Sequence, residues 1–107
     1  MSSITWPDGA RVAVAITFDV DSESSLLGDF PDRAHRLVGT TSFMRYDSVA
    51  LPQILQLYRE QQLTQTFFMP AWTMEHYPEM VEAILADGHE LAAHGYLHEA
   101  PKGLMHV

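Results

Sequence analysis

The sequence contains no cysteine, and only six of its 107 residues are lysine or arginine. Without cysteine there is neither a disulfide bond nor a thiolate metal ligand, so any metal must be held by histidine and carboxylate side chains. Fourteen aspartate and glutamate residues outweigh the basic ones and give a formal net charge of −8. A surface of this sign repels phosphate backbones and anionic lipids, which argues against nucleic acid and membranes as partners.

Long apolar segments are also missing. The longest run, residues 12–16, is far shorter than the roughly 20 residues that span a bilayer. The beginning of the chain, MSSITWPDGARV, lacks the basic start and the apolar run of about 7 to 15 residues that mark a signal peptide. We therefore expect a cytoplasmic protein, and 107 residues suffice for one globular domain with a modest core.

Three segments have the character of β-strands. Residues 11–18 (RVAVAITF) are almost continuously apolar and rich in Val and Ile, which is typical of a strand buried on both faces of a parallel sheet. Residues 65–69 (QTFFM) predict a second strand, and residues 89–93 (HELAA) have the length and location of a third.

Two helices are predicted between these strands. Apolar residues at helical spacing predict one helix over residues 48–62, which starts near Pro52 because proline suits a first turn. A second helix begins at Pro78 and ends before Gly88, and residues 19–41 predict a long loop. Strand, helix, strand, helix and strand in this order predict an α/β fold built from right-handed βαβ units around a parallel sheet.

Two polar clusters follow the predicted strands directly. Asp19 and Asp21 (TFDVDSE) come after the first strand, and His94 and His98 (HGYLHE) come after the third. Since parallel strands end at the same edge of a sheet, we expect the clusters to lie together. Carboxylate and imidazole ligands suit zinc, and three of them leave a position open for water. The two histidines can face one point if residues 95–99 begin a helical turn.

Each cluster alone has an ordinary explanation, because HxxxH and DxD motifs also occur in exposed loops and helix caps. Their joint position at one sheet edge is what favours a site. We expect the neighbouring residues to have ordinary structural or surface roles. Glu23 is expected to be a solvated loop carboxylate, His89 a structural or solvent-facing residue, and Phe68 and Trp72 to pack at the rim of the site.

The segments TFDVD, TQTFFMPAW and GHELAAHGYLHE resemble the opening motifs of the polysaccharide deacetylase family, the carbohydrate esterase group that shares the NodB homology domain. The resemblance covers most of the chain. It is closest to a cytoplasmic branch of peptidoglycan-deacetylase-like and allantoinase-like proteins, which begins in a way similar to WPDGARVAV. The resemblance implies a distorted barrel of parallel strands and helices, of which residues 1–107 supply the N-terminal part.

The resemblance also implies roles for individual residues. Asp19 matches the general base, Asp21 the metal-binding carboxylate, and His94 and His98 the histidine ligands of a divalent metal, with zinc as the first choice. The implied reaction is hydrolysis of an amide C–N bond in an acetylated amino sugar or polysaccharide. A cyclic amide such as allantoin, a catalytically inactive metal-binding fragment, and an α/β interaction module without metal remain the alternatives.

Family members carry later motifs, an arginine segment and a further histidine that acts as general acid, and these 107 residues contain neither. We therefore expect the chain alone to have little hydrolase activity. Three parallel strands cannot close a barrel, and an unpaired strand edge pairs readily with another chain. The sequence accordingly predicts self-association into a homo-oligomer.

Overall fold

The computed structural model describes residues 4–32 and 38–99, and only the backbone of residues 38–46. Its strands are β1 (Thr17–Asp19), β2 (Thr66–Met69) and β3 (Glu90–Ala93). Its helices are η1 (Pro7–Gly9), α1 (Ser24–Asp29), α2 (Val38–Gln61), α3 (Ala71–His76) and α4 (Pro78–Ala86). The strands pair in parallel in the order β1-β2-β3, which confirms the predicted α/β fold and its parallel sheet.

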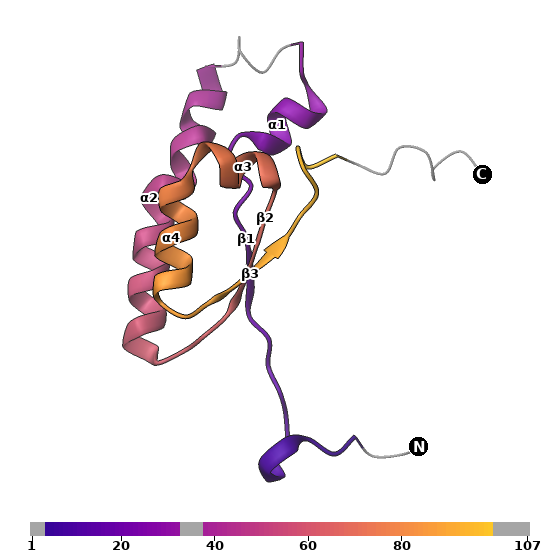
Figure 1. Cartoon of the computed structure of the whole chain (residues 1–107), viewed down its shortest axis with the longest axis vertical. Coiled ribbons are helices and arrows are strands. Elements are labelled where there is room, and N and C mark those ends of the chain that lie inside the picture. The colour runs from indigo at the N-terminus through magenta and orange to yellow at the C-terminus, as the bar shows by residue number, and fades with distance from the viewer. Residues whose placement is uncertain (1–3, 33–37, 100–107) are drawn as a thin grey trace, which may run out of the picture.

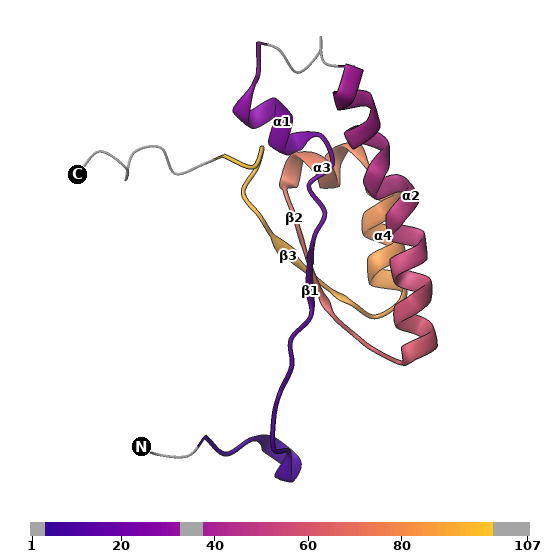
Figure 2. The ribbon, with the colours of Figure 1, turned by 180° about the vertical axis from the view of Figure 1, so that it is seen from behind.

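The helices are distributed unevenly around the sheet. Helices α2 and α4 lie side by side against one face of the strands, as both Figure 1 and Figure 2 show. The short helices α1 and α3 lie instead beyond the carboxyl ends of the strands. The residues that follow β3 run to the same end of the sheet (Figure 1). Within residues 4–32 and 38–99, none of the helices combines the length and the apolar character that a transmembrane span requires.

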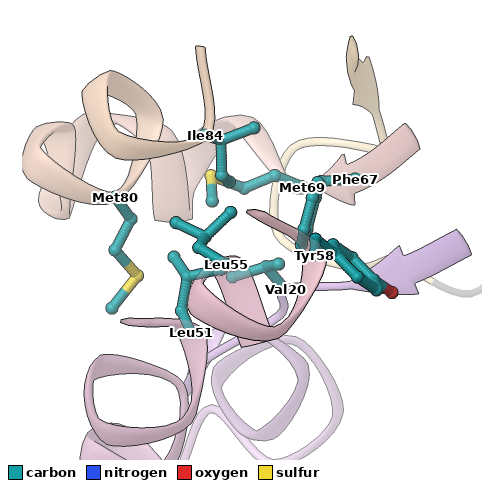
Figure 3. Packing of buried hydrophobic residues seen from close by; sticks show 8 residues of the cluster. All are labelled: Val20, Leu51, Leu55, Tyr58, Phe67, Met69, Met80 and Ile84. Atoms are coloured by element: carbon teal, nitrogen blue, oxygen red, sulfur yellow. The ribbon is translucent and has the colours of Figure 1, made fainter. Parts of the chain in front are cut away.

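A single apolar cluster joins the sheet to α2 and α4 (Figure 3). Alternate residues of β2, Phe67 and Met69, are fully buried, as expected where one face of a strand meets a helix layer. Residues three and four apart on α2 and α4 supply the other side. The complete cluster is Val20, Leu51, Leu55, Tyr58, Phe67, Met69, Met80 and Ile84.

The first strand is much shorter than predicted. Only Thr17–Asp19 pairs with β2, while Val12 and Val14 are 70% and 78% exposed. The segment before β1 leads away from α2 and α4 in both views, so neither of these helices covers it (Figures 1 and 2). The Ile16 N–H donates to the side-chain Oε1 of Gln65 at 3.1 Å. The prediction of burial on both faces was therefore wrong for this segment, although its composition is that of a buried strand.

The helices also differ from prediction. The expected long loop of residues 19–41 contains α1 and the beginning of α2, and α3 was not predicted. Helix α2 does not start near Pro52 but contains it. A proline inside a helix removes one backbone hydrogen bond and costs about 3 kcal/mol, yet Leu51 and Leu55 beside it are almost fully buried, and this burial favours a continuous helix.

The remaining elements agree with the predictions to within one residue. Strands β2 and β3 lie where expected, and α4 starts at Pro78 and ends before Gly88, whose φ of 78° suits a residue just past a helix. His89 is buried between the rings of Tyr58 and Phe67, and its Nδ1 accepts a hydrogen bond from the Gln65 N–H at 3.1 Å. His89 therefore has a structural role.

Candidate metal centre

Three of the predicted site residues converge at the carboxyl edge of the sheet. One candidate ligand atom from each of Asp21, His94 and His98 lies within 4.8 Å of the other two. The Nε2 atom of His98 is 3.5 Å from Asp21 Oδ2, and that of His94 is 3.8 Å from Asp21 Oδ1. The structure thus brings together residues that are separated by more than 70 positions in the sequence, as the parallel arrangement predicts.

The spacing of these atoms fits a small divalent ion. Zinc bonds to nitrogen and oxygen of roughly 2.0–2.2 Å place two tetrahedral ligands about 3.4 Å apart, close to the separations observed. Among the described residues, no hydrogen-bond partner reaches the buried Oδ1 atom of Asp21. A buried carboxylate oxygen without a donor is unfavourable, and a cation between Asp21 and the histidines would satisfy it. The two imidazoles and one carboxylate are therefore a suitable donor set for zinc.

The electrostatics of Asp21 agree with this interpretation. Burial raises the pKa of the Asp21 carboxyl above its ordinary value, and the neighbouring His98 and His94 lower it only in part. The Asp19 and Asp47 carboxylates raise this pKa further by repulsion. The ionised form of Asp21 is thus disfavoured where it stands, and a divalent cation beside it would favour that form.

The two histidines do not lie on a helical turn. Residues 95–99 form a bend in which Gly95 and His98 have φ values of 73° and 55°. The Tyr96 N–H donates to Oε2 of Glu99 at 3.2 Å, which closes the loop on itself. A helical turn, the one route considered from the sequence, is therefore not how these histidines meet. The bend with its left-handed residues also brings positions four apart together, and the rings of His94 and His98 are 5.0 Å apart, edge to face.

Asp19 lies at the same edge of the sheet but outside the group of three. It is the last residue of β1, its side chain is exposed, and it is in register with Phe68 of β2. The ring of Phe68 is 6.4 Å from that of His94, so Asp19 and His94 flank a half-buried aromatic side chain. The Asp19 side chain is thus accessible to solvent.

The loop that carries Asp21 is anchored by contacts that the sequence did not indicate. Ser22, at φ 50°, donates from its N–H to Oδ2 of Asp47 at 2.7 Å. Glu23 is only 4% exposed, and the hydroxyl of Tyr77 donates to its carboxylate at 2.7 Å. The prediction of a solvated Glu23 was wrong, since its partner lies 54 positions along the chain and no local pattern reveals it. Burial and the bond to Glu23 raise the pKa of Tyr77 to about 12.

The fold and these side chains together define a class: an α/β protein with a candidate metal centre at the carboxyl edge of its parallel sheet. The sequence profile of the polysaccharide deacetylase family matches residues 8–106, and the chain belongs to this family.

Individual relatives of the chain are named as deacetylases. The chain is 33% identical over 96 residues to a peptidoglycan deacetylase of Helicobacter pylori, an overlap of 85% of this chain and 31% of the relative. It is 29% identical over 97 residues to a peptidoglycan-N-acetylglucosamine deacetylase of Bacillus cereus, covering 89% of this chain and 34% of that protein.

A solved structure confirms the fold. A protein of Mycobacterium smegmatis assigned as a polysaccharide deacetylase superposes with a TM-score of 0.89 at 40% sequence identity, over 97% of this chain and 36% of the other. The chain thus spans about a third of the length of the relatives it matches.

Proposed function

We propose that this chain carries the metal-binding part of a hydrolase that removes the acetyl group from an acetylated amino sugar. The observation that carries the proposal is the convergence of Asp21, His94 and His98 at the sheet edge, with an unpartnered carboxylate oxygen among them. Family membership supports the same conclusion, because the family is one of deacetylases.

Each residue then has a chemical role. Asp21, His94 and His98 would hold zinc, which when bound activates a water and polarises the amide carbonyl. Asp19, exposed at the same edge, accepts the proton of the attacking water as general base. Departure of the amine needs a general acid, a role that we assign to none of the described residues.

The relatives favour an acetamido group over a cyclic amide as the substrate. Both curated relatives described above are peptidoglycan deacetylases, and one is named for N-acetylglucosamine. The half-buried Phe68, whose ring is 6.4 Å from that of His94, supplies an aromatic surface beside the candidate ligands against which a sugar can pack. We therefore propose a polymer of N-acetylated amino sugars as the substrate class, and residues 1–107 as the N-terminal part of the deacetylase domain.

Calorimetric titration of the metal-stripped chain with zinc tests the site. We expect one ion per chain, and a loss of at least about 100-fold in affinity for His94→Ala or His98→Ala, because each removes one of three ligands. Glu82→Ala is the control, since Glu82 is an exposed acidic residue of α4 outside the group of three. Equal zinc affinity in all three variants would contradict the proposed site.

Acetate release from N-acetylglucosamine oligomers tests the reaction, in a full-length enzyme that carries this segment. Asp19→Asn is expected to lower turnover by about 10² to 10⁴-fold while zinc affinity is retained, because removal of a general base has an effect of this size. Turnover unchanged in the variant would exclude Asp19 as the base. Zinc binding without any acetate release would leave a metal-binding domain that is not catalytic.

A further inference from the structure

The first turn of α3 contacts the loop that carries the two histidines. The Ala71 N–H donates to the carbonyl of Gly95 at 3.0 Å, and the Trp72 N–H donates to that of Tyr96 at 2.9 Å. The first N–H groups of a helix have no partner within the helix, so they are free to bind another segment. Both acceptors lie between His94 and His98, and α3 therefore fixes the backbone of the histidine loop.

The next residue of α3 contacts the other half of the site. The hydroxyl of Thr73, which is fully buried, donates to the backbone carbonyl of Asp21 at 2.8 Å. This carbonyl also accepts hydrogen bonds from the N–H and the hydroxyl of Ser24, at 3.1 and 2.6 Å. Ser24 is the first residue of α1 and lies three positions after Asp21, so of these three donors only Thr73 comes from a distant part of the chain.

Three consecutive residues of α3 thus hold both loops that supply the candidate ligands. The links from Ala71 and Trp72 use backbone atoms and survive most substitutions, whereas the link from Thr73 depends on its side chain. We propose that Thr73 is a positioning residue that sets the Asp21 carboxylate against His94 and His98 before the metal binds. This inference rests on the metal site proposed above and adds the part of the fold that pre-organises it.

The physical reason is that metal affinity depends on ligands that are already in place. If the loop that carries the carboxylate is not held in place relative to the histidines, it must become ordered when the ion binds. The conformational entropy lost in this ordering opposes binding. Residues that orient ligands through hydrogen bonds typically change metal affinity by about 10 to 100-fold when they are removed. A purely structural threonine would instead change the stability of the metal-free chain and leave zinc affinity as it was.

Zinc titrations of Thr73→Val and Thr73→Ser distinguish these roles. Valine keeps the shape of threonine but has no hydroxyl, and we expect zinc affinity to fall by about 10-fold or more. Serine keeps the donor, and its affinity is expected to stay within about threefold of wild type. Thr66→Val is the control for the loss of a threonine hydroxyl, because Thr66 Oγ1 donates to Glu90 Oε2 at 2.6 Å in an exposed bond at the opposite end of β2. The control should bind zinc as the wild type does.

Circular dichroism of the metal-free variants is recorded alongside the titrations. If Thr73→Val does not fold, Thr73→Ala, which imposes less bulk in the same position, is titrated in its place and is expected to show the same loss. Wild-type affinity in a folded Thr73→Val or Thr73→Ala, even with a lower melting temperature, would overturn the role of Thr73. A wild-type chain that binds no zinc would overturn the proposed function first, and this inference with it.

Discussion

At the residue scale, Gly28 of α1 is in close contact with the histidine loop. A Cβ atom built on Gly28 would lie 2.3 Å from the backbone carbonyl oxygen of Leu97, the neighbour of His98. Real Cβ atoms do not approach backbone atoms so closely, so any side chain at this position must displace either α1 or the loop. The position requires glycine because of this contact and not because of its backbone angles.

Gly28→Ala is therefore expected to weaken zinc binding by about 10-fold or more, because it moves the loop that carries His98. Alanine by itself favours a helix over glycine by about 0.5–1 kcal/mol, so a loss cannot be ascribed to helix propensity. Calorimetric titration measures the effect, with the exposed Asp29→Ala in the same helix as the control. Wild-type affinity in Gly28→Ala would show that the loop shifts without consequence for the metal.

Tyr77 gives a second prediction at this scale. Its folded-state pKa of about 12 exceeds the ordinary value of 10.0, so the folded chain keeps the phenol proton at a pH where the unfolded chain loses it. The stabilising contribution of Tyr77 is then fully present below pH 10.0 and is lost as the pH rises towards about 12. Urea unfolding of the metal-free chain should show this alkaline loss, and Tyr77→Phe should show less of it. Equal losses in both proteins would contradict the buried bond to Glu23.

At the scale of elements, adjacent residues of α4 differ sharply in burial. Ile84 is fully buried against the sheet, while Leu85 is 53% exposed. The sequence pattern does not separate the two, because a helical period defines an apolar arc but not its edges. In the described part of the chain α4 packs against α2 and β3, and Leu85 lies outside this contact.

Ile84→Ala is expected to lower the free energy of unfolding by about 2–5 kcal/mol, because it leaves a cavity in the core. Leu85→Ala, its neighbour, should lower it by less than about 1 kcal/mol, as is usual for an exposed position. Denaturant unfolding of the two variants measures the difference. Similar losses in both would mean that α4 is rotated relative to the arrangement in Figure 3.

At the scale of the whole molecule, β1 is an edge strand of the sheet that the described residues form. Strand β1 is the first in the order β1-β2-β3, and the segment before it leaves Val12, Val14 and Ile16 exposed. Unpaired edges beside apolar side chains pair readily with further strands. We predict that the 107-residue chain associates with a second copy of itself through this edge, and that it has little acetate-releasing activity alone.

Light scattering of the purified chain tests the association. Added salt should strengthen it, because screening reduces the repulsion between copies that each carry a net charge of −8. Val14→Lys should weaken it, whereas Val49→Lys, at a valine of α2 that is also exposed, should not. A monomer at every salt concentration would contradict the prediction.

The sequence by itself determined the parallel α/β fold and the convergence of its two polar clusters. Periodicity and composition are local properties, and strand polarity alone places Asp21, His94 and His98 at one edge. The same local reasoning could not find α3, the buried Glu23, or the close approach of Gly28, because each depends on a partner far along the chain. It also misjudged residues 11–16, whose burial depends on neighbours that the described residues do not supply. Only the tertiary structure decided how the candidate ligands are held, since the bonds from Thr73 and Tyr77 cross more than 50 positions of the sequence.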